Sequence, residues 1–149
     1  MKDAIDNAKE ELKRVDHLIY VSLKYTRTCD IFKSIIDRLI NTIDFALEAI
    51  LIKMEDEHKI MEIPAQPGIR CSVIKEKVDD EKITNILDFY LLLRQMSRAD
   101  FTRDREYRRH VTMTMEIDGN VHEVNIDSMT QNYKDTRDYV EYVESSLGL

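Results

Sequence analysis

Apolar positions near the start of the chain recur at three- and four-residue steps, which predicts an amphipathic helix over about residues 3–26. This stripe consists of Ile5, Ala8, Leu12, Val15 and Ile19 and ends at the small residue Ser22. A longer and more apolar stripe from Phe32 to Met54 predicts a helix over residues 30–58, with Thr28 or Asp30 as its N-cap. We expect this second helix to lie at the centre of the fold.

The middle of the chain loses this periodicity. Both prolines lie between Ile60 and Ser72, which predicts a connecting loop because proline cannot continue a helix. A third helix is predicted to begin at Asp79 or Asp80 and to follow apolar steps as far as Met96. After Met96 the pattern turns polar, and we expect the helix to continue as an arginine-rich end up to His110.

The last part of the chain changes period. Alternation over residues 112–126, broken at Asp118-Gly119-Asn120, predicts a β-hairpin. Ser128 and Gln131 have the spacing of a capping box and predict a final helix over residues 128–147. The sequence therefore predicts one mainly α domain, 1–149: a four-to-five-helix bundle of the up-down type, with a small β-hairpin before the C-terminal helix. The Met-rich face of an isolated hairpin needs cover from the helices or from a second subunit.

Charge is distributed unevenly over this pattern. The net charge of −7 argues against nucleic-acid binding over the whole surface. Residues 94–110, however, hold six of the 22 basic residues and only three acids. The N-terminus lacks the apolar stretch of a signal peptide, and residues 31–54 carry too many charges to span a membrane, so we expect a cytoplasmic protein.

The basic segment contains an arginine and a histidine at a helical spacing. Arg103 and His110 are seven residues apart, which places them on one face of the predicted helix, whereas Arg105 would point about 140° away from His110. Glu106, one turn before His110, could orient the imidazole. Histidine moves protons near neutral pH and arginine stabilises phosphate charge, so the pair suits cleavage of a ribose-phosphate backbone without a metal or cofactor.

Four further arginines of the segment are candidate phosphate contacts that carry no base specificity. They are Arg94, Arg98, Arg108 and Arg109. The alternative interpretation is a solvated helix face whose arginines pair with the acids of an acidic protein, with His110 simply ending the helix.

The order of helices followed by Arg and His resembles the HEPN superfamily, helical domains with an arginine, four to six residues and a histidine near the end of their third main helix. Both Arg105 and Arg103 satisfy this spacing to His110. Asp104 supplies the polar residue that the family often has after its arginine, so Arg103, Asp104 and His110 are the preferred matches. The hairpin after His110 departs from the family's simplest form.

This resemblance implies an RNA-binding protein or a metal-independent ribonuclease that acts as a homodimer. His110 would be its general acid/base, Arg103 would bind phosphate, and Asp104 or Glu106 would orient the site. The competing hypothesis is a non-catalytic oligomerisation or adaptor module that binds a partner protein through helix 30–58 and the Met-rich hairpin. In that case we expect Arg103 and His110 to be paired within one subunit.

Other candidate sites are weaker. Glu55-Asp56-Glu57-His58 combines acids with a histidine, but consecutive helical residues point in different directions, which favours a charged helix end over a metal site. His122 falls beside Met115 on the apolar hairpin face, which favours a packing role. Cys29 and Cys71 lie outside any zinc-ligand spacing and are expected to be buried thiols.

Overall fold

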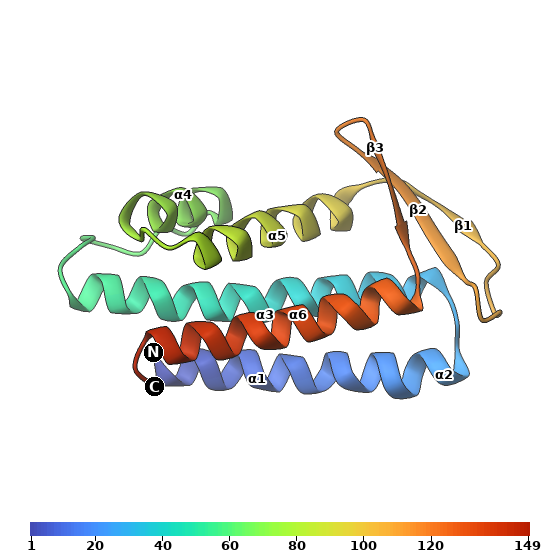
Figure 1. Cartoon of the computed structure of the whole chain (residues 1–149), viewed down its shortest axis with the longest axis horizontal. Helices are drawn as coiled ribbons and strands as arrows, with labels where there is room; N and C mark the ends of the chain where they lie inside the picture. Colours follow the sequence, from blue (N-terminus) through green and yellow to red (C-terminus); the bar gives the residue numbers. More distant parts are fainter.

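A computed structural model describes residues 1–149 and has a mainly α fold with one small antiparallel sheet (Figure 1). The helices are α1 (Lys2–His17), η1 (Leu18–Ser22, a π-helical stretch), α2 (Leu23–Tyr25), α3 (Cys29–Asp56), α4 (Pro67–Lys77), α5 (Glu81–Arg98) and α6 (Ile126–Ser146). The strands are β1 (Phe101–Asp104), β2 (Thr112–Ile117) and β3 (Asn120–Val124). The bundle and the hairpin before the last helix are therefore as predicted.

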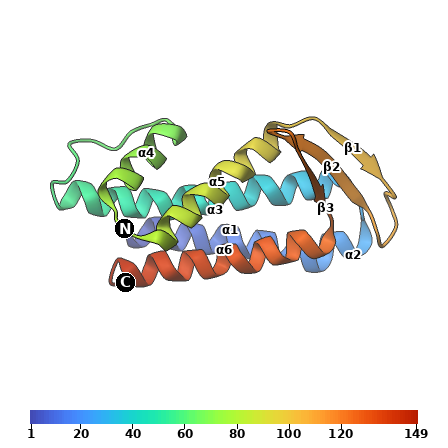
Figure 2. The same cartoon turned by 45° about the horizontal axis from the view of Figure 1, so that its top comes forward.

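Helix α3 forms the centre of the bundle, with α1 and α6 along one side and α4 and α5 along the other (Figure 1). It can fill this place because its stripe is apolar around much of its circumference, and Phe32, Ile36 and Leu39 are fully buried. Helix α5 crosses the bundle at an angle, as the turned view shows (Figure 2). The two chain termini lie side by side at one end, where Lys9 and Glu144 form an ion pair of 2.6 Å.

The sheet lies at the opposite end of the bundle and has the order β1-β2-β3. Met113 is paired with Val124, and Met113 and Met115 are buried, so the apolar face of the hairpin is covered within the chain. Asp118 and Gly119 have φ values of 52° and 81°, as a type I′ turn requires at both central positions. Pairing of Met115 with His122 confirms that the histidine lies beside this apolar face.

The predicted third helix was too long. Helix α5 begins after Asp80, whose carboxylate accepts the N–H groups of Lys82 and Ile83, but it ends at Arg98 rather than at His110. Ala99 is extended, with φ −72° and ψ 145°, and the next residues form β1. The segment Arg103 to His110 therefore is not helical, and Arg103 and His110 do not share a helix face.

Three smaller corrections concern helix ends. Helix α4 occupies residues 67–77, partly within the predicted loop, because a proline is well tolerated in the first turn of a helix. Thr28 is at the N-cap position of α3 but its side chain makes no cap hydrogen bond. The capping box of α6 is formed by Asn125 and Ser128, three residues before the predicted pair, so this helix begins at Ile126.

None of the helices combines the length and the apolar character that a membrane crossing needs.

Candidate nucleic-acid interface

The arginine-rich segment forms β1 and the loop of residues 105–111 that joins β1 to β2. This loop is anchored where α2 meets α3, because the N–H of Tyr107 donates to the carbonyl oxygen of Arg27 at 2.6 Å. Residues 24–27 and 105–110, distant in the sequence, therefore lie together at the sheet end of the bundle (Figure 1).

Arg103 is held against the start of α3. It is paired across the sheet with Met113, whose side chain faces the helices, so both side chains extend from the same face. Its guanidinium lies 2.9 Å from the Asp30 carboxylate and 3.5 Å from that of Glu106. The hydrogen bond to Asp30 raises the pKa of Arg103, so the guanidinium is fully charged and already neutralised within the chain.

Glu106 is directed at the N-terminus of α3. Its carboxylate accepts the backbone N–H of Cys29 at 3.4 Å, in place of the side-chain cap that Thr28 does not provide. A carboxylate is favourable at this position because the first N–H groups of a helix are unpaired and the helix dipole is positive there. Burial and the nearby Glu106 raise the pKa of the Cys29 thiol, which is therefore a neutral packed group.

The predicted Arg-His arrangement is not what the chain forms. His110 is exposed, and no hydrogen bond or ion pair joins its ring to Arg103, Asp104 or Glu106. Its carbonyl oxygen accepts the hydroxyl of Thr112 at 2.9 Å. Asp104 is exposed and approaches only Arg105, at 3.8 Å. The prediction that Glu106 orients His110 was therefore wrong, because it assumed a helical spacing.

The remaining side chains of these two segments form an exposed cationic and aromatic surface, which we call the tip surface. It consists of Lys24, Tyr25, Arg105, Tyr107, Arg108, Arg109 and His110. Tyr25 is 80% exposed and Tyr107 is 77% exposed, the two most exposed aromatic residues of the chain. Exposed single aromatic residues are common on protein surfaces, so the feature that distinguishes this surface is that both tyrosines stand among unpaired basic side chains.

The cations of the tip surface are free. Lys24, Arg108 and Arg109 make no side-chain hydrogen bond and no ion pair within 4 Å, and Arg105 has only its exposed contact with Asp104. Residues 24–27 and 105–110 together hold five basic residues and one acid, Glu106, which faces inward. This end of an acidic protein therefore carries a concentrated positive potential.

The backbone of the loop is strained where it presents these side chains. Arg105 and Tyr107 have φ values of 55° and 67°, a region that residues with a Cβ adopt at a cost. The anchors to Arg27 and Cys29 hold the loop in this conformation. Strain of this kind is commonly found at binding surfaces, and the π-helical stretch η1 just before Lys24 is another feature often found there.

Arg94 and Arg98 lie elsewhere, on the last two turns of α5. They line a groove of about 220 Å³ between α3 and α5, which we call the α3–α5 groove. Its lining residues are Asp37, Ile40, Asn41, Arg94, Ser97 and Arg98. The arginines predicted to contact phosphate are therefore divided between this groove and the tip surface.

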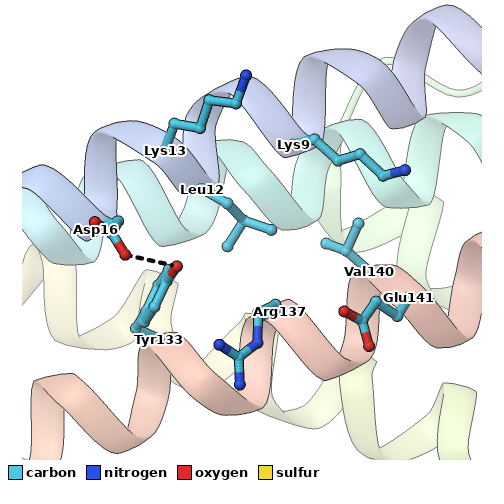
Figure 3. Close-up of a pocket in the computed structure, with 8 residues that line it drawn as sticks. All are labelled: Lys9, Leu12, Lys13, Asp16, Tyr133, Arg137, Val140 and Glu141. Carbon is cyan, nitrogen blue, oxygen red and sulfur yellow. Dashed lines mark hydrogen bonds between the residues drawn. The ribbon is translucent and has the colours of Figure 1, made fainter.

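A groove of about 330 Å³ between α1 and α6 is less suited to a ligand (Figure 3). Leu12 and Val140 face each other across it, while Lys13 points away from α6. Its charged groups are used within the chain: Tyr133 donates to Asp16 at 3.1 Å, and Lys9 pairs with Glu144. Arg137 lies over the Tyr133 ring at 5.8 Å.

The sequence-based site omitted Lys24, Tyr25 and Tyr107. The available signal was a tyrosine between basic residues, which occurs in both Lys24-Tyr25-Thr26-Arg27 and Arg105-Glu106-Tyr107-Arg108-Arg109.

Comparison of the chain with protein-family models, with curated proteins and with solved structures gave no match.

Proposed function

We propose that this protein binds single-stranded RNA through the tip surface. The observation that carries the proposal is the pair of exposed tyrosines, Tyr25 and Tyr107, set among lysine and arginine side chains that have no partner in the chain. Single-stranded nucleic acids are bound by this combination, in which bases stack on aromatic rings while cations contact the phosphates.

The chemistry of each part fits a single strand. Stacking on Tyr25 or Tyr107 requires a base that is not enclosed in a duplex. Arg108 and Arg109 can contact phosphate oxygens through two N–H groups each, and they contribute affinity without reading the base. Affinity with little sequence preference is therefore expected.

A half-buried arginine supports an anionic ligand at the same end. The Nε atom of Arg27 is buried and has no hydrogen-bond partner, although its carbonyl oxygen anchors Tyr107. Unpaired buried N–H groups are rare because losing water without a replacement costs free energy. A phosphate oxygen could supply the missing acceptor only if the Arg27 side chain turned its Nε–H toward the surface.

RNA is preferred over DNA because of the resemblance to the HEPN superfamily, many members of which are ribonucleases. Cleavage is not included in the proposal, since Arg103 is neutralised by Asp30 and Glu106 and His110 makes no contact with it. The adaptor hypothesis expected Arg103 and His110 to be paired within one subunit: Arg103 is so paired, and His110 is not. The Met-rich face expected to mediate assembly is buried under the helices, so an adaptor function is less favoured. The homodimer and a partner protein stay predictions.

Binding of a fluorescent eight-nucleotide oligouridylate, followed by anisotropy, tests the proposal. The double variant Arg108→Gln/Arg109→Gln is expected to weaken binding about tenfold at low salt and to reduce the slope of log K against log salt by about 1.4, or 0.7 per lost phosphate contact. Lys75→Gln/Lys77→Gln is the control: it removes the same charge from exposed positions of α4, at the far end of the bundle.

The form of the ligand provides the second test. The oligouridylate paired with an oligoadenylate should bind more weakly than the single strand, since bases enclosed in a duplex cannot stack on the tyrosines. If duplex RNA binds as tightly as the single strand, or if both double variants lose the same affinity, the tip surface is not a single-strand site and the proposal is wrong.

A further inference from the structure

The α3–α5 groove contains two arginines with no partner in the chain. Arg94 and Arg98 are one helical turn apart on α5, and neither makes a side-chain hydrogen bond or an ion pair. The guanidinium of Arg94 lies over the ring of Tyr90 at 5.8 Å, which limits its movement. The one carboxylate of the groove, Asp37, already accepts the hydroxyl of Ser97 at 3.0 Å.

A row of cations joins this groove to the tip surface. The ammonium group of Lys33, on the first turns of α3, donates to the carbonyl oxygen of Ser97 at 2.6 Å and lies 5.7 Å from the centre of the Phe101 ring. The guanidinium of Arg103 lies 5.1 Å from the same ring. Lys33 therefore lies in the interval between the two arginines of the groove and the basic loop after β1, whereas the charge of Arg103 beside it is matched by Asp30 and Glu106.

The length of this row can be taken from α3, which runs beside it. Asp30 pairs with Arg103 next to the tip surface, and Asn41 lines the groove. At 1.5 Å per residue these two positions are about 16 Å apart along the helix. At the rise of one strand in a DNA duplex, about 3.4 Å per nucleotide, the interval corresponds to about five nucleotides.

We propose that the α3–α5 groove is a second phosphate-binding subsite for the RNA strand whose bases stack at the tip surface. This inference rests on the proposed function. Arg98 is exposed and has no carboxylate partner, and Arg94 lies near the Asp44 carboxylate behind the groove. Guanidinium groups one turn apart can hold a single phosphate or two successive ones. Asn41 adds a side-chain amide able to donate to a phosphate or a ribose hydroxyl.

The length of the RNA separates the two sites. A four-nucleotide oligouridylate can occupy the tip surface alone, whereas a twelve-nucleotide oligouridylate can reach the groove. In the variant Arg94→Gln/Arg98→Gln, affinity for the twelve-nucleotide RNA is expected to fall about tenfold at low salt, with a decrease of about 1.4 in the salt slope. Affinity for the four-nucleotide RNA should be unchanged.

Controls make each outcome decisive. Removing Arg94 from the Tyr90 ring could disturb folding, so Arg98→Gln alone serves as a second variant that changes only an exposed side chain. It should show a smaller loss of affinity for the twelve-nucleotide RNA. Lys75→Gln/Lys77→Gln should bind both RNAs as the parent does. Equal losses for the short and long RNA, or no loss for either, would overturn the subsite. If the parent protein binds neither RNA, the proposed function itself fails.

Discussion

The carboxylate of Glu106 accepts the backbone N–H of Cys29 at 3.4 Å, and this bond joins the loop after β1 to the first turn of α3. The same carboxylate approaches Arg103, which in turn pairs with Asp30. Two residues of the catalytic group suggested by the sequence, Arg103 and Glu106, thus serve to hold the loop in place. The side chains that the loop presents outward are different ones, Tyr107, Arg108 and Arg109.

Replacing Glu106 should destabilise the protein measurably. Glu106→Ala removes the acceptor for the N–H of Cys29 and a favourable charge at a helix N-terminus, so we expect a loss of about 1 kcal/mol in the free energy of unfolding. Urea denaturation followed by circular dichroism measures it. The neighbouring Asp104→Ala is the control, since the Asp104 side chain is 69% exposed and should cost less than about 0.5 kcal/mol. Equal effects would refute the capping role of Glu106.

Asp80 should make a pH-dependent contribution to stability. The hydrogen bond from Tyr142 lowers the pKa of Asp80 in the folded protein. A lowered pKa stabilises the fold above the unfolded pKa, near 3.8, and this stabilisation is lost as the pH falls through the folded pKa. Asp80→Asn keeps a good N-cap, so it should be slightly less stable than the parent at pH 6, and the difference should shrink as the pH falls through the folded pKa of Asp80.

Unfolding curves of Asp80→Asn and the parent at several pH values provide the measurement. The control is Asp79→Asn, because the exposed Asp79 has no hydrogen bond to either partner of Asp80 and its stability difference should not vary with pH. A difference for Asp80→Asn that persists unchanged at low pH would contradict the assignment.

Met113 should anchor the sheet to the bundle. Its side chain is fully buried, so Met113→Ala leaves a cavity. We expect the free energy of unfolding to fall by roughly 2–5 kcal/mol, the usual range when a buried methionine is replaced by alanine. Hydrogen exchange should accelerate most in residues 101–124. Val121, which is 69% exposed on the adjacent strand, provides the matched control, and Val121→Ala should leave exchange nearly unchanged. Similar effects of both changes would argue against this packing.

The aromatic part of the tip surface can be tested separately from its charge. Tyr25→Ala should weaken binding of an eight-nucleotide oligouridylate about tenfold, because stacking of a base on an aromatic ring contributes about 1–3 kcal/mol. Tyr25→Phe retains the ring and should bind as the parent does. Neither change should affect unfolding, since Tyr25 is 80% exposed. Loss of binding in both variants would assign the effect to the hydroxyl group instead of stacking.

Most of the fold could be predicted from local patterns in the chain. Helices α1, α3 and α6 have long stripes at helical spacing, and Asp118-Gly119 carries the turn chemistry of a type I′ hairpin, so nearby residues specify these elements. The sequence also located the basic segment, because clustering of arginines is visible without a structure. These features depend on periodicity and residue type, which neighbours along the chain determine.

Long-range pairing determined the remainder. Phe101 to Asp104 has no strand-like period of its own, and it becomes β1 because it pairs with β2, from Met115 back to Thr112. Tyr25 and Tyr107 share one end of the bundle because the N–H of Tyr107 meets the carbonyl oxygen of Arg27. Helical spacing predicted that Arg103 and His110 share one face. Backbone hydrogen bonds of the sheet and loop join residues distant in the sequence instead, and they direct Arg103 to Asp30 and leave His110 exposed.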